Sequence, residues 1–186
     1  MKELSLNILD ISQNSLKAGA ENVSIEIDEV SQSGTLILTI SDDGCGMSEE
    51  MVKNVIDPFC TSRKTRKVGL GIPLLKLAAE QTGGYITIAS KLRENYPTDH
   101  GTVVKAVFNK DSIDFTPLGD IISTLIVIIQ GHPHVDYLYK HSTDKGVVLL
   151  DTREIREVLG EQISLADFEV LEWIKEYLEE AYKEIE

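Results

Sequence analysis

Residues 35–47 read TLILTISDDGCGM, an alternation of apolar and polar residues that runs into an acidic, glycine-rich segment. The alternation over residues 35–40 predicts a strand, and residues 23–27 alternate in the same way across the turn residues 32–34, which predicts a hairpin. Glycines at positions 44 and 46 predict a glycine-rich loop after this strand. The other elements can be placed outward from this strand and loop.

Helices and further strands flank this stretch on both sides. Apolar spacing predicts helices over 3–18, 48–56 and 69–81 and strands over 85–90 and 101–108. Beyond residue 109 it predicts a helix starting at Thr116 and Pro117, a hairpin of 135–139 with 147–150, and helices over 151–159 and 165–185. This order predicts an α+β fold, a two-layer α/β sandwich with a mixed sheet. We expect residues 1–110 to form one domain and residues 111–186 a small α/β C-terminal extension.

Composition and charge narrow the possible partners. The chain has 186 residues, of which 42% are hydrophobic and 26% charged, and its 18 basic and 31 acidic residues give a net charge of −13. A globular protein of this charge is not expected to bind nucleic acid or an acidic membrane, because both need excess Lys and Arg. The longest aliphatic run, residues 125–129, is too short to span a bilayer. Two cysteines, Cys45 and Cys60, make no disulfide framework, so the expected location is cytoplasmic.

Several common nucleotide and metal motifs are missing or incomplete. The sequence contains no P-loop, and the turn Gly69-Leu70-Gly71 lacks the preceding strand and the third glycine of a dinucleotide-binding fingerprint. His132, His134 and His141 have no further ligand at a suitable spacing, so no metal site is expected there.

A polar stripe runs along the first predicted helix. Asn7, Asp10, Asn14 and Lys17 follow spacings of 3, 4 and 3, which puts them on one face of a helix. Such a stripe either faces water or carries a site, and spacing alone leaves both interpretations open.

Taken in order, five motifs resemble those of the GHKL ATPase superfamily, which includes DNA gyrase, the ninety-kilodalton heat-shock chaperone, histidine kinases and MutL proteins. They lie at residues 10–20, 42–47, 57–62, 69–72 and 101–102, and the resemblance covers about residues 3–108. The resemblance implies the Bergerat-type ATP-binding fold, with ATP and Mg²⁺ as ligands and a protein as partner or substrate.

The resemblance also implies roles for individual residues. Asn14 would ligate Mg²⁺ through its amide oxygen, a hard donor that suits this ion. Asp42 would accept a hydrogen bond from the adenine amine, which favours adenine over a base with a carbonyl there. The other implied ATP-binding residues are Lys17, Gly44, Gly46, Met47, Thr61, Arg63, Lys64, Gly69, Leu70, Gly71 and Thr102. Gly69 and Gly71 would open a helix whose N–H groups face phosphate, and residues 58–69 would form a basic lid over ATP.

Asp10 is the candidate catalytic residue, because it lies one helical turn before Asn14 on the same face. MutL proteins and the anti-sigma kinases of the family carry glutamate there, which orients or deprotonates the attacking water or hydroxyl. Aspartate offers the same chemistry with a shorter reach, so we expect this departure from the family to weaken turnover and to leave nucleotide binding unaffected.

Two functions therefore stay open. One is an ATPase or protein kinase that acts in trans on a separate partner, and the other is a regulatory ATP-binding module without turnover. The predicted helix with Asn14 begins at residue 3, so we expect no dimerising hairpin with a phosphoacceptor histidine before it. DNA repair, by analogy with MutL, conflicts with the net charge of −13.

Residues 111–186 match no motif. The last predicted helix has an apolar stripe, which must be covered either by the sheet or by a second copy in a homodimer. The stripe consists of Phe168, Leu171, Ile174, Leu178, Tyr182 and Ile185. Residues 151–186 also contain 12 acidic and 4 basic residues, so most of the net negative charge lies at this end.

Overall fold

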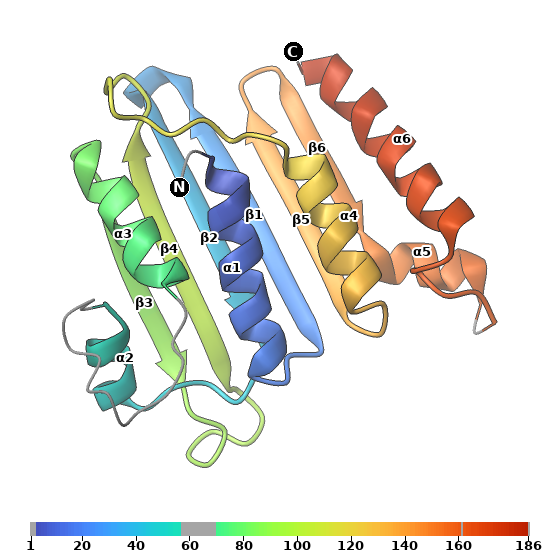
Figure 1. Ribbon diagram of the computed structural model, residues 1–186, viewed down its shortest axis with the longest axis horizontal. Helices are drawn as coiled ribbons and strands as arrows, with labels where there is room; N and C mark the ends of the chain where they lie inside the picture. The colour runs from blue at the N-terminus through green and yellow to red at the C-terminus, as the bar shows by residue number, and fades with distance from the viewer. Residues whose placement is uncertain (1–2, 57–69, 161, 186) are drawn as a thin grey trace.

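The computed structural model describes residues 3–56, 70–160 and 162–185. In these ranges six strands form one sheet with the order β3-β4-β2-β1-β5-β6 (Figure 1). The strands are β1 Asn22–Val30, β2 Thr35–Asp42, β3 Tyr85–Lys91, β4 Gly101–Asn109, β5 Asp136–Thr143 and β6 Gly146–Asp151. Neighbouring strands are antiparallel except β1 and β5, which are parallel. The sheet is therefore mixed, and the predicted α+β class is confirmed.

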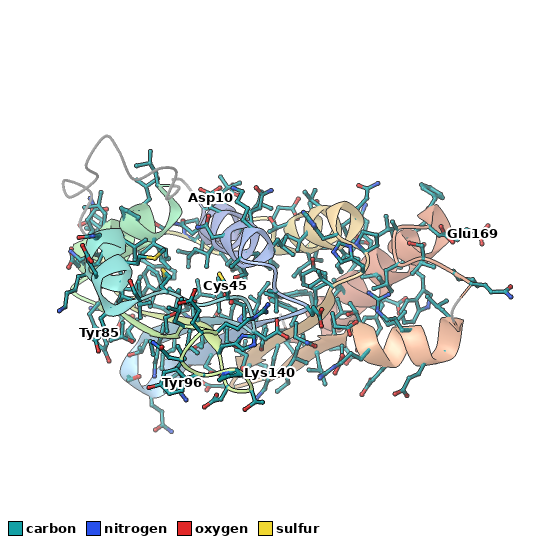
Figure 2. All side chains as sticks on the ribbon, turned by 90° about the horizontal axis from the view of Figure 1, so that it is seen from below. Asp10, Cys45, Tyr85, Tyr96, Lys140 and Glu169 are labelled. Carbon is teal, nitrogen blue, oxygen red and sulfur yellow. The ribbon has the colours of Figure 1, made fainter. Side chains whose placement is uncertain are left out.

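Helices α1, α3, α4 and α6 pack side by side on one face of this sheet. The bounds of the described helices are α1 Leu4–Lys17, α2 Glu49–Ile56, α3 Gly71–Gln81, α4 Ile121–Gly131, α5 Thr152–Leu159 and α6 Phe168–Ile185. Figure 2 shows α1, α3 and α4 on the same side of the sheet as Asp10, with Tyr85 and Lys140 on the opposite side. The molecule thus has the two layers that the order of elements predicts.

The core lies between the helices and the central strands. Alternate residues of β1 and β2 are buried because successive side chains of a strand point to opposite faces. The buried members are Val23, Ile25, Ile27, Leu36, Leu38 and Ile40. Leu4, Ile8 and Ile11 of α1 are buried in the same cluster, as are Leu75 and Ala79 of α3.

Residues 111–186 extend the same sheet. Strand β5 pairs with β1, β6 pairs with β5, and α4 contacts both α1 and α6. Leu125 and Ile128 of α4 and Tyr137 and Tyr139 of β5 belong to the same buried cluster as the N-terminal residues. The hairpin predicted from 135–139 and 147–150 is thus confirmed as the pair β5 and β6.

The start of α4 differs from the prediction. The helix begins at Ile121, where the carboxylate of Asp120 accepts the N–H of Ser123 (2.9 Å), and it does not begin at residue 116. The carbonyl of Pro117 instead accepts the N–H of Leu4 (2.9 Å), and the carbonyl of Leu118 accepts that of Ser5 (2.9 Å). Residues 117 and 118 thereby satisfy free N–H groups in the first turn of α1.

The polar stripe of α1 and the apolar stripe of α6 each contain one residue whose exposure differs from that of the other members. Asn7 is buried and does not face water with the other polar residues of its stripe. In the orientation that satisfies its side-chain amide, the oxygen accepts a hydrogen bond from the backbone N–H of Leu75 in α3 (3.3 Å). In α6, Leu171, Ile174 and Leu178 are buried, whereas Phe168 is 76% exposed.

Among the described helices, none combines the length and apolarity that crossing a membrane would require.

Candidate functional site

Asp42, the last residue of β2, is the centre of a polar cluster that joins three elements. Its Oδ2 accepts a hydrogen bond from the hydroxyl of Ser15 on α1 (2.7 Å), and its Oδ1 accepts the N–H of Gly44 (3.0 Å). Across the sheet it pairs with Thr102 of β4. A single half-buried carboxylate therefore fixes the positions of α1, the glycine-rich loop and the start of β4.

The environment of Asp42 changes its titration. Burial raises the pKa of its carboxyl above the ordinary 3.8 and outweighs the hydrogen bonds from Ser15 and Gly44, which lower it, while the charge of Asp43 raises it further. A further hydrogen-bond donor from a ligand would therefore stabilise the charged form of this half-buried carboxylate.

Asp43 has a different role from its neighbour. Its Oδ1 accepts the N–H groups of Glu21 (2.8 Å) and Asn22 (2.9 Å), and its Oδ2 accepts the Asn22 side-chain amide (2.8 Å). Burial pushes its pKa up, but these hydrogen bonds outweigh it and the pKa is lowered. Asp43 thus ties the loop to the start of β1, and its carboxylate is already satisfied by the protein.

Two glycines allow backbone segments to meet at this site. A Cβ on Gly101, which has a φ of 131°, would lie 1.9 Å from the carbonyl oxygen of Asp42. A Cβ on Gly46, with a φ of 69°, would lie 2.0 Å from the carbonyl oxygen of Lys91. Other residues do not tolerate both the close approach and the positive φ, so Gly101 lets the start of β4 lie against the end of β2, and Gly46 lets the loop lie against the end of β3.

A cavity of about 680 Å³ opens beside Asp42, between α2 and the ends of β3 and β4. Ser90, His100 and Thr102 contribute polar atoms to its wall, and Val52 of α2 contributes an apolar one. The Ser90 hydroxyl lies 2.9 Å from that of Thr102 and accepts the N–H of Met47 (2.8 Å). The volume is within the range of small-molecule sites, which combine apolar walls with a few placed polar groups.

The second part of the site lies where α1 meets the start of α3. A Cβ on the buried Gly71 would lie 2.9 Å from the Cβ of Asp10, so the N-terminus of α3 packs directly on this residue. Leu70, 68% exposed, occupies the N-cap position without a side-chain cap, and Pro73 has no N–H to offer. The N–H groups of Gly71 and Ile72 are therefore the ones that this helix start can present to an anion.

The remaining predicted site residues divide into two groups. Asn14 is half-buried and Lys17 exposed, both on α1, and Met47 is half-buried beside the core. Gly44, like Gly46, is buried in the glycine-rich loop. Thr61, Arg63, Lys64 and Gly69 lie outside the described residues, as does Cys60, whereas Cys45 is exposed.

The donor chemistry around Asn14 fits Mg²⁺ bound together with phosphates. Among residues 3–56, 70–160 and 162–185, no three His, Cys, Asp or Glu side chains gather as a metal site. Mg²⁺ typically takes one or two protein oxygens and completes its shell with phosphate and water. The amide oxygen of Asn14 and the carboxylate of Asp10, one turn apart on α1, are oxygen donors of this kind.

Sequence reasoning missed three side chains that organise the site. Ser15 donates to Asp42, Ser90 bridges the loop and β4, and Nδ1 of His100 lies 2.7 Å from the carbonyl oxygen of Gly44. Ser15 directly follows Asn14, and Ser90 ends its predicted strand at a position facing the helices. The positions of Ser15 and Ser90 on their elements could be predicted from the sequence. Their hydrogen-bond partners, and that of His100, could not, because the partners lie 27 to 56 residues away in sequence.

The sequence matches a family model over residues 2–112, more than half of the chain: the histidine kinase-, DNA gyrase B- and HSP90-like ATPases. It is 31% identical over 96 residues to sensor protein KdpD of Clostridium acetobutylicum, which covers 49% of this chain and 10% of that protein. It is 33% identical over 86 residues to sporulation kinase D of Bacillus subtilis, 46% of this chain and 17% of that protein. The chain therefore matches only a small part of the length of either relative.

The fold resembles the Aquifex aeolicus MutL ATPase domain, which was solved in complex with ADP. The TM-score is 0.56 at 13% identity, over 86% of this chain and 69% of that one. This share exceeds the stretch matched by the family model, so the likeness in fold includes part of residues 113–186. The family match and the mixed sheet with its helical layer lead to one conclusion: the chain belongs to the histidine kinase-, DNA gyrase B- and HSP90-like ATPase family, whose domains bind ATP.

Proposed function

We propose that this protein binds Mg-ATP with the adenine at Asp42 and the phosphates at the start of α3, and that it turns ATP over. The products are ADP and either phosphate or a phosphorylated partner protein. The observation that carries this proposal is the contact between Gly71 and Asp10, 2.9 Å from a Cβ on the glycine to the Cβ of the acid. It puts a carboxylate beside a helix N-terminus that suits phosphate oxygens.

Each residue has a separate task in this proposal. Asp42 accepts a hydrogen bond from the adenine amine, a donor that complements its half-buried carboxylate. Bound Mg-ATP supplies the phosphoryl group, with Asn14 as the protein ligand of the ion. The N–H groups of Gly71 and Ile72 donate to phosphate oxygens, and Asp10 accepts the proton of the attacking water or hydroxyl.

One observation favours the alternative, a regulatory module that binds ATP without turning it over. Asp10 is exposed, and within the described residues its carboxylate forms no hydrogen bond or salt bridge. A general base works best when a second group orients it, and aspartate reaches less far than glutamate. In that case closure around ATP would change how a partner protein binds.

Substitution of Asp10 separates the two functions. We expect wild-type protein to release phosphate from Mg-ATP, and Asp10→Asn to lower the rate by about 100-fold or more while ATP affinity stays within about threefold. Asp10→Glu, with a longer reach, should turn over at least as fast as wild type. Gln13→Ala, an exposed neighbour on α1, is the matched control and should leave the rate unchanged.

The outcomes are distinct in a phosphate-release assay paired with calorimetry. Equal turnover in Asp10→Asn and wild type would remove Asp10 as the base. ATP binding by the wild type with no phosphate release, together with no release in Asp10→Glu, would favour the regulatory module.

A further inference from the structure

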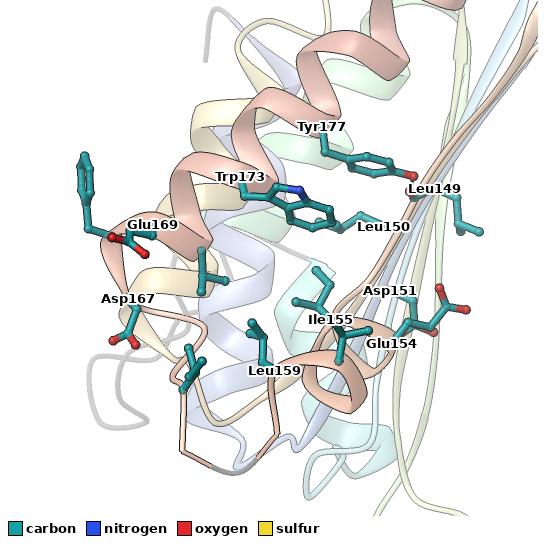
Figure 3. Close-up of a pocket in the computed structure, with 14 residues that line it drawn as sticks. Leu149, Leu150, Asp151, Glu154, Ile155, Leu159, Asp167, Glu169, Trp173 and Tyr177 are labelled. Carbon is teal, nitrogen blue, oxygen red and sulfur yellow. Dashed lines mark hydrogen bonds between the residues drawn. The ribbon is translucent and has the colours of Figure 1, made fainter.

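A second cavity, of about 1030 Å³, lies far from Asp42, in a groove between α5, α6 and the edge strand β6. Figure 3 shows Trp173 and Tyr177 of α6 above the groove, with Ile155 and Leu159 of α5 on the other side. The proposed nucleotide site uses none of these residues. The groove is therefore a second feature that needs its own explanation.

Large apolar side chains in this groove are open to solvent. Val158 is 87% exposed, Phe168 76% and Trp173 53%. The rings of Trp173 and Tyr177 are stacked at 5.6 Å with 12° between their planes, which gives α6 a flat aromatic surface. Single exposed apolar residues are ordinary, but a continuous set along one groove is typical of an interaction site.

Acidic side chains border the apolar surface. Figure 3 places Asp151 and Glu154 at one end of the groove and Asp167 and Glu169 at the other. Asp151 is paired with Arg153 (2.6 Å), whereas the other three form no salt bridge with a residue that the structure describes. With 12 acidic and 4 basic residues over 151–186, this surface complements a basic partner.

Helix α6 forms a hydrogen bond with the backbone of the edge strand β6. The hydroxyl of Tyr177 donates to the carbonyl of Leu149 in β6 (2.9 Å), so α6 already occupies one backbone acceptor of the edge strand. This contact disfavours the addition of a further strand. A groove between two helices, floored by apolar side chains, instead suits a helix with an apolar face.

We propose that this groove binds an amphipathic helical segment of a partner protein, with its apolar face on Phe168 and Trp173 and Lys or Arg residues against Glu154, Asp167 and Glu169. A second copy of this chain fits less well, because it would bring two surfaces with the same acidic excess together. A small apolar molecule would leave the bordering acids without partners.

Trp173 is the single tryptophan of the chain, so its fluorescence reports on this groove alone. The full chain is titrated with three synthetic peptides of equal length. The first is an amphipathic helix with Leu at helical spacing and Lys on the polar face. The second has Glu in place of every Lys, and the third has the composition of the first in a scrambled order. Only the first is expected to shift the Trp173 emission to the blue and to saturate.

Variants at exposed positions test the contacts without disturbing the core. Phe168→Ser should weaken binding of the Lys peptide about tenfold or more, as expected for an aromatic anchor. Replacing Glu154, Asp167 and Glu169 with Gln, Asn and Gln should weaken binding and reduce its salt dependence. Ile113→Ser, at a 99% exposed position outside the groove, is the matched control and should bind like wild type.

Four outcomes would overturn the proposal. The first is no saturable fluorescence change with the Lys peptide, and the second is equal binding of the Glu or the scrambled peptide. The third is unchanged affinity in Phe168→Ser. The fourth is a dimer in sedimentation equilibrium that Phe168→Ser dissociates, since this would make a second copy the occupant. ATP affinity is measured in the same variants and should stay at the wild-type value, so failure here is separate from failure of the proposed ATP site.

Discussion

The cavity beside Asp42 and the groove between α5 and α6 are built in opposite ways. Around Asp42 the polar atoms are paired at hydrogen-bond distance and glycines bring backbone segments into contact, so almost every group has a defined partner. In the groove between α5 and α6 the side chains are apolar, exposed and bordered by acids. The first arrangement suits a small polar ligand held in one orientation, and the second suits a surface that another protein covers.

The largest loss of stability should follow a substitution of Gly101, where the start of β4 approaches the backbone of Asp42 closely. Gly101→Ala would place a methyl group 1.9 Å from the carbonyl oxygen of Asp42 at a φ of 131°. We expect the free energy of unfolding to fall by about 3 kcal/mol and ATP binding to weaken with it. Urea denaturation followed by circular dichroism measures the first quantity.

Gly83→Ala is the control for Gly101→Ala. Gly83 also has a positive φ, 82°, but nothing lies within 4 Å of its Cβ position. Its cost should be about 1 kcal/mol, that of the left-handed backbone alone. If both variants lose the same stability, contact with β2 is not what requires glycine at position 101.

Substitutions of the adjacent residues Asp42 and Asp43 should affect different properties, ATP affinity in one case and stability in the other. Asp42→Asn should weaken ATP binding by about thirtyfold, or about 2 kcal/mol, because the amide replaces one acceptor with a donor. Asp43→Asn should leave affinity nearly unchanged and lower stability by about 1 kcal/mol, because its three donors are all within the protein. Calorimetry with ATP and thermal melting of both variants test this division. Loss of affinity in Asp43→Asn alone would reverse the assignment.

A buried polar network holds α6, one wall of the groove, on the sheet. His141, 4% exposed, lies between Glu29 (Nε2 to Oε1, 3.1 Å) and Tyr182 of α6 (Nδ1 to Oη, 2.9 Å). Lys110 pairs with the same Glu29, and Tyr139 contacts the hydroxyl of Tyr182. Burial lowers the pKa of His141 below its ordinary value of 6.5, against the opposing effect of the Glu29 carboxylate, which raises it.

The smallest predicted effect is therefore a dependence of stability on pH. A lowered pKa means that the folded state binds fewer protons than the unfolded state below pH 6.5, so stability should decrease as the pH falls through this range. His141→Gln should abolish this decrease while losing some stability at every pH. Melting temperatures between pH 7.5 and pH 5.5 measure the slope. An equal slope in the variant would assign the dependence to another group.

Much of the fold was predictable from periodicity. Alternation in residues 23–27 and 35–40 predicted β1 and β2, and the hairpin predicted from 135–139 and 147–150 is the pair β5 and β6. Spacing also predicted α1, α3 and α6 within about three residues of their ends. These elements are regular because each packs one apolar face on the same core.

The rest depends on contacts between distant residues, which local patterns do not encode. The start of α4 is set by Leu4 and Ser5 of α1, which use the carbonyls of residues 117 and 118. Asn7 has the spacing of a water-facing residue and is buried because α3 packs over it. The parallel pairing of β5 with β1 joins strands more than 100 residues apart, and neither strand carries a signal for it.

Calorimetry of the full chain with Mg-ATP and with Mg-GTP shows whether Asp42 accepts a hydrogen bond from adenine in the 680 Å³ cavity. Guanine presents a carbonyl where adenine presents an amine, so a carboxylate that discriminates between them should reject it. We predict saturable heat with Mg-ATP and at least about thirtyfold weaker binding of Mg-GTP. Equal affinity for the two nucleotides, or no heat with either, would show that Asp42 does not recognise adenine.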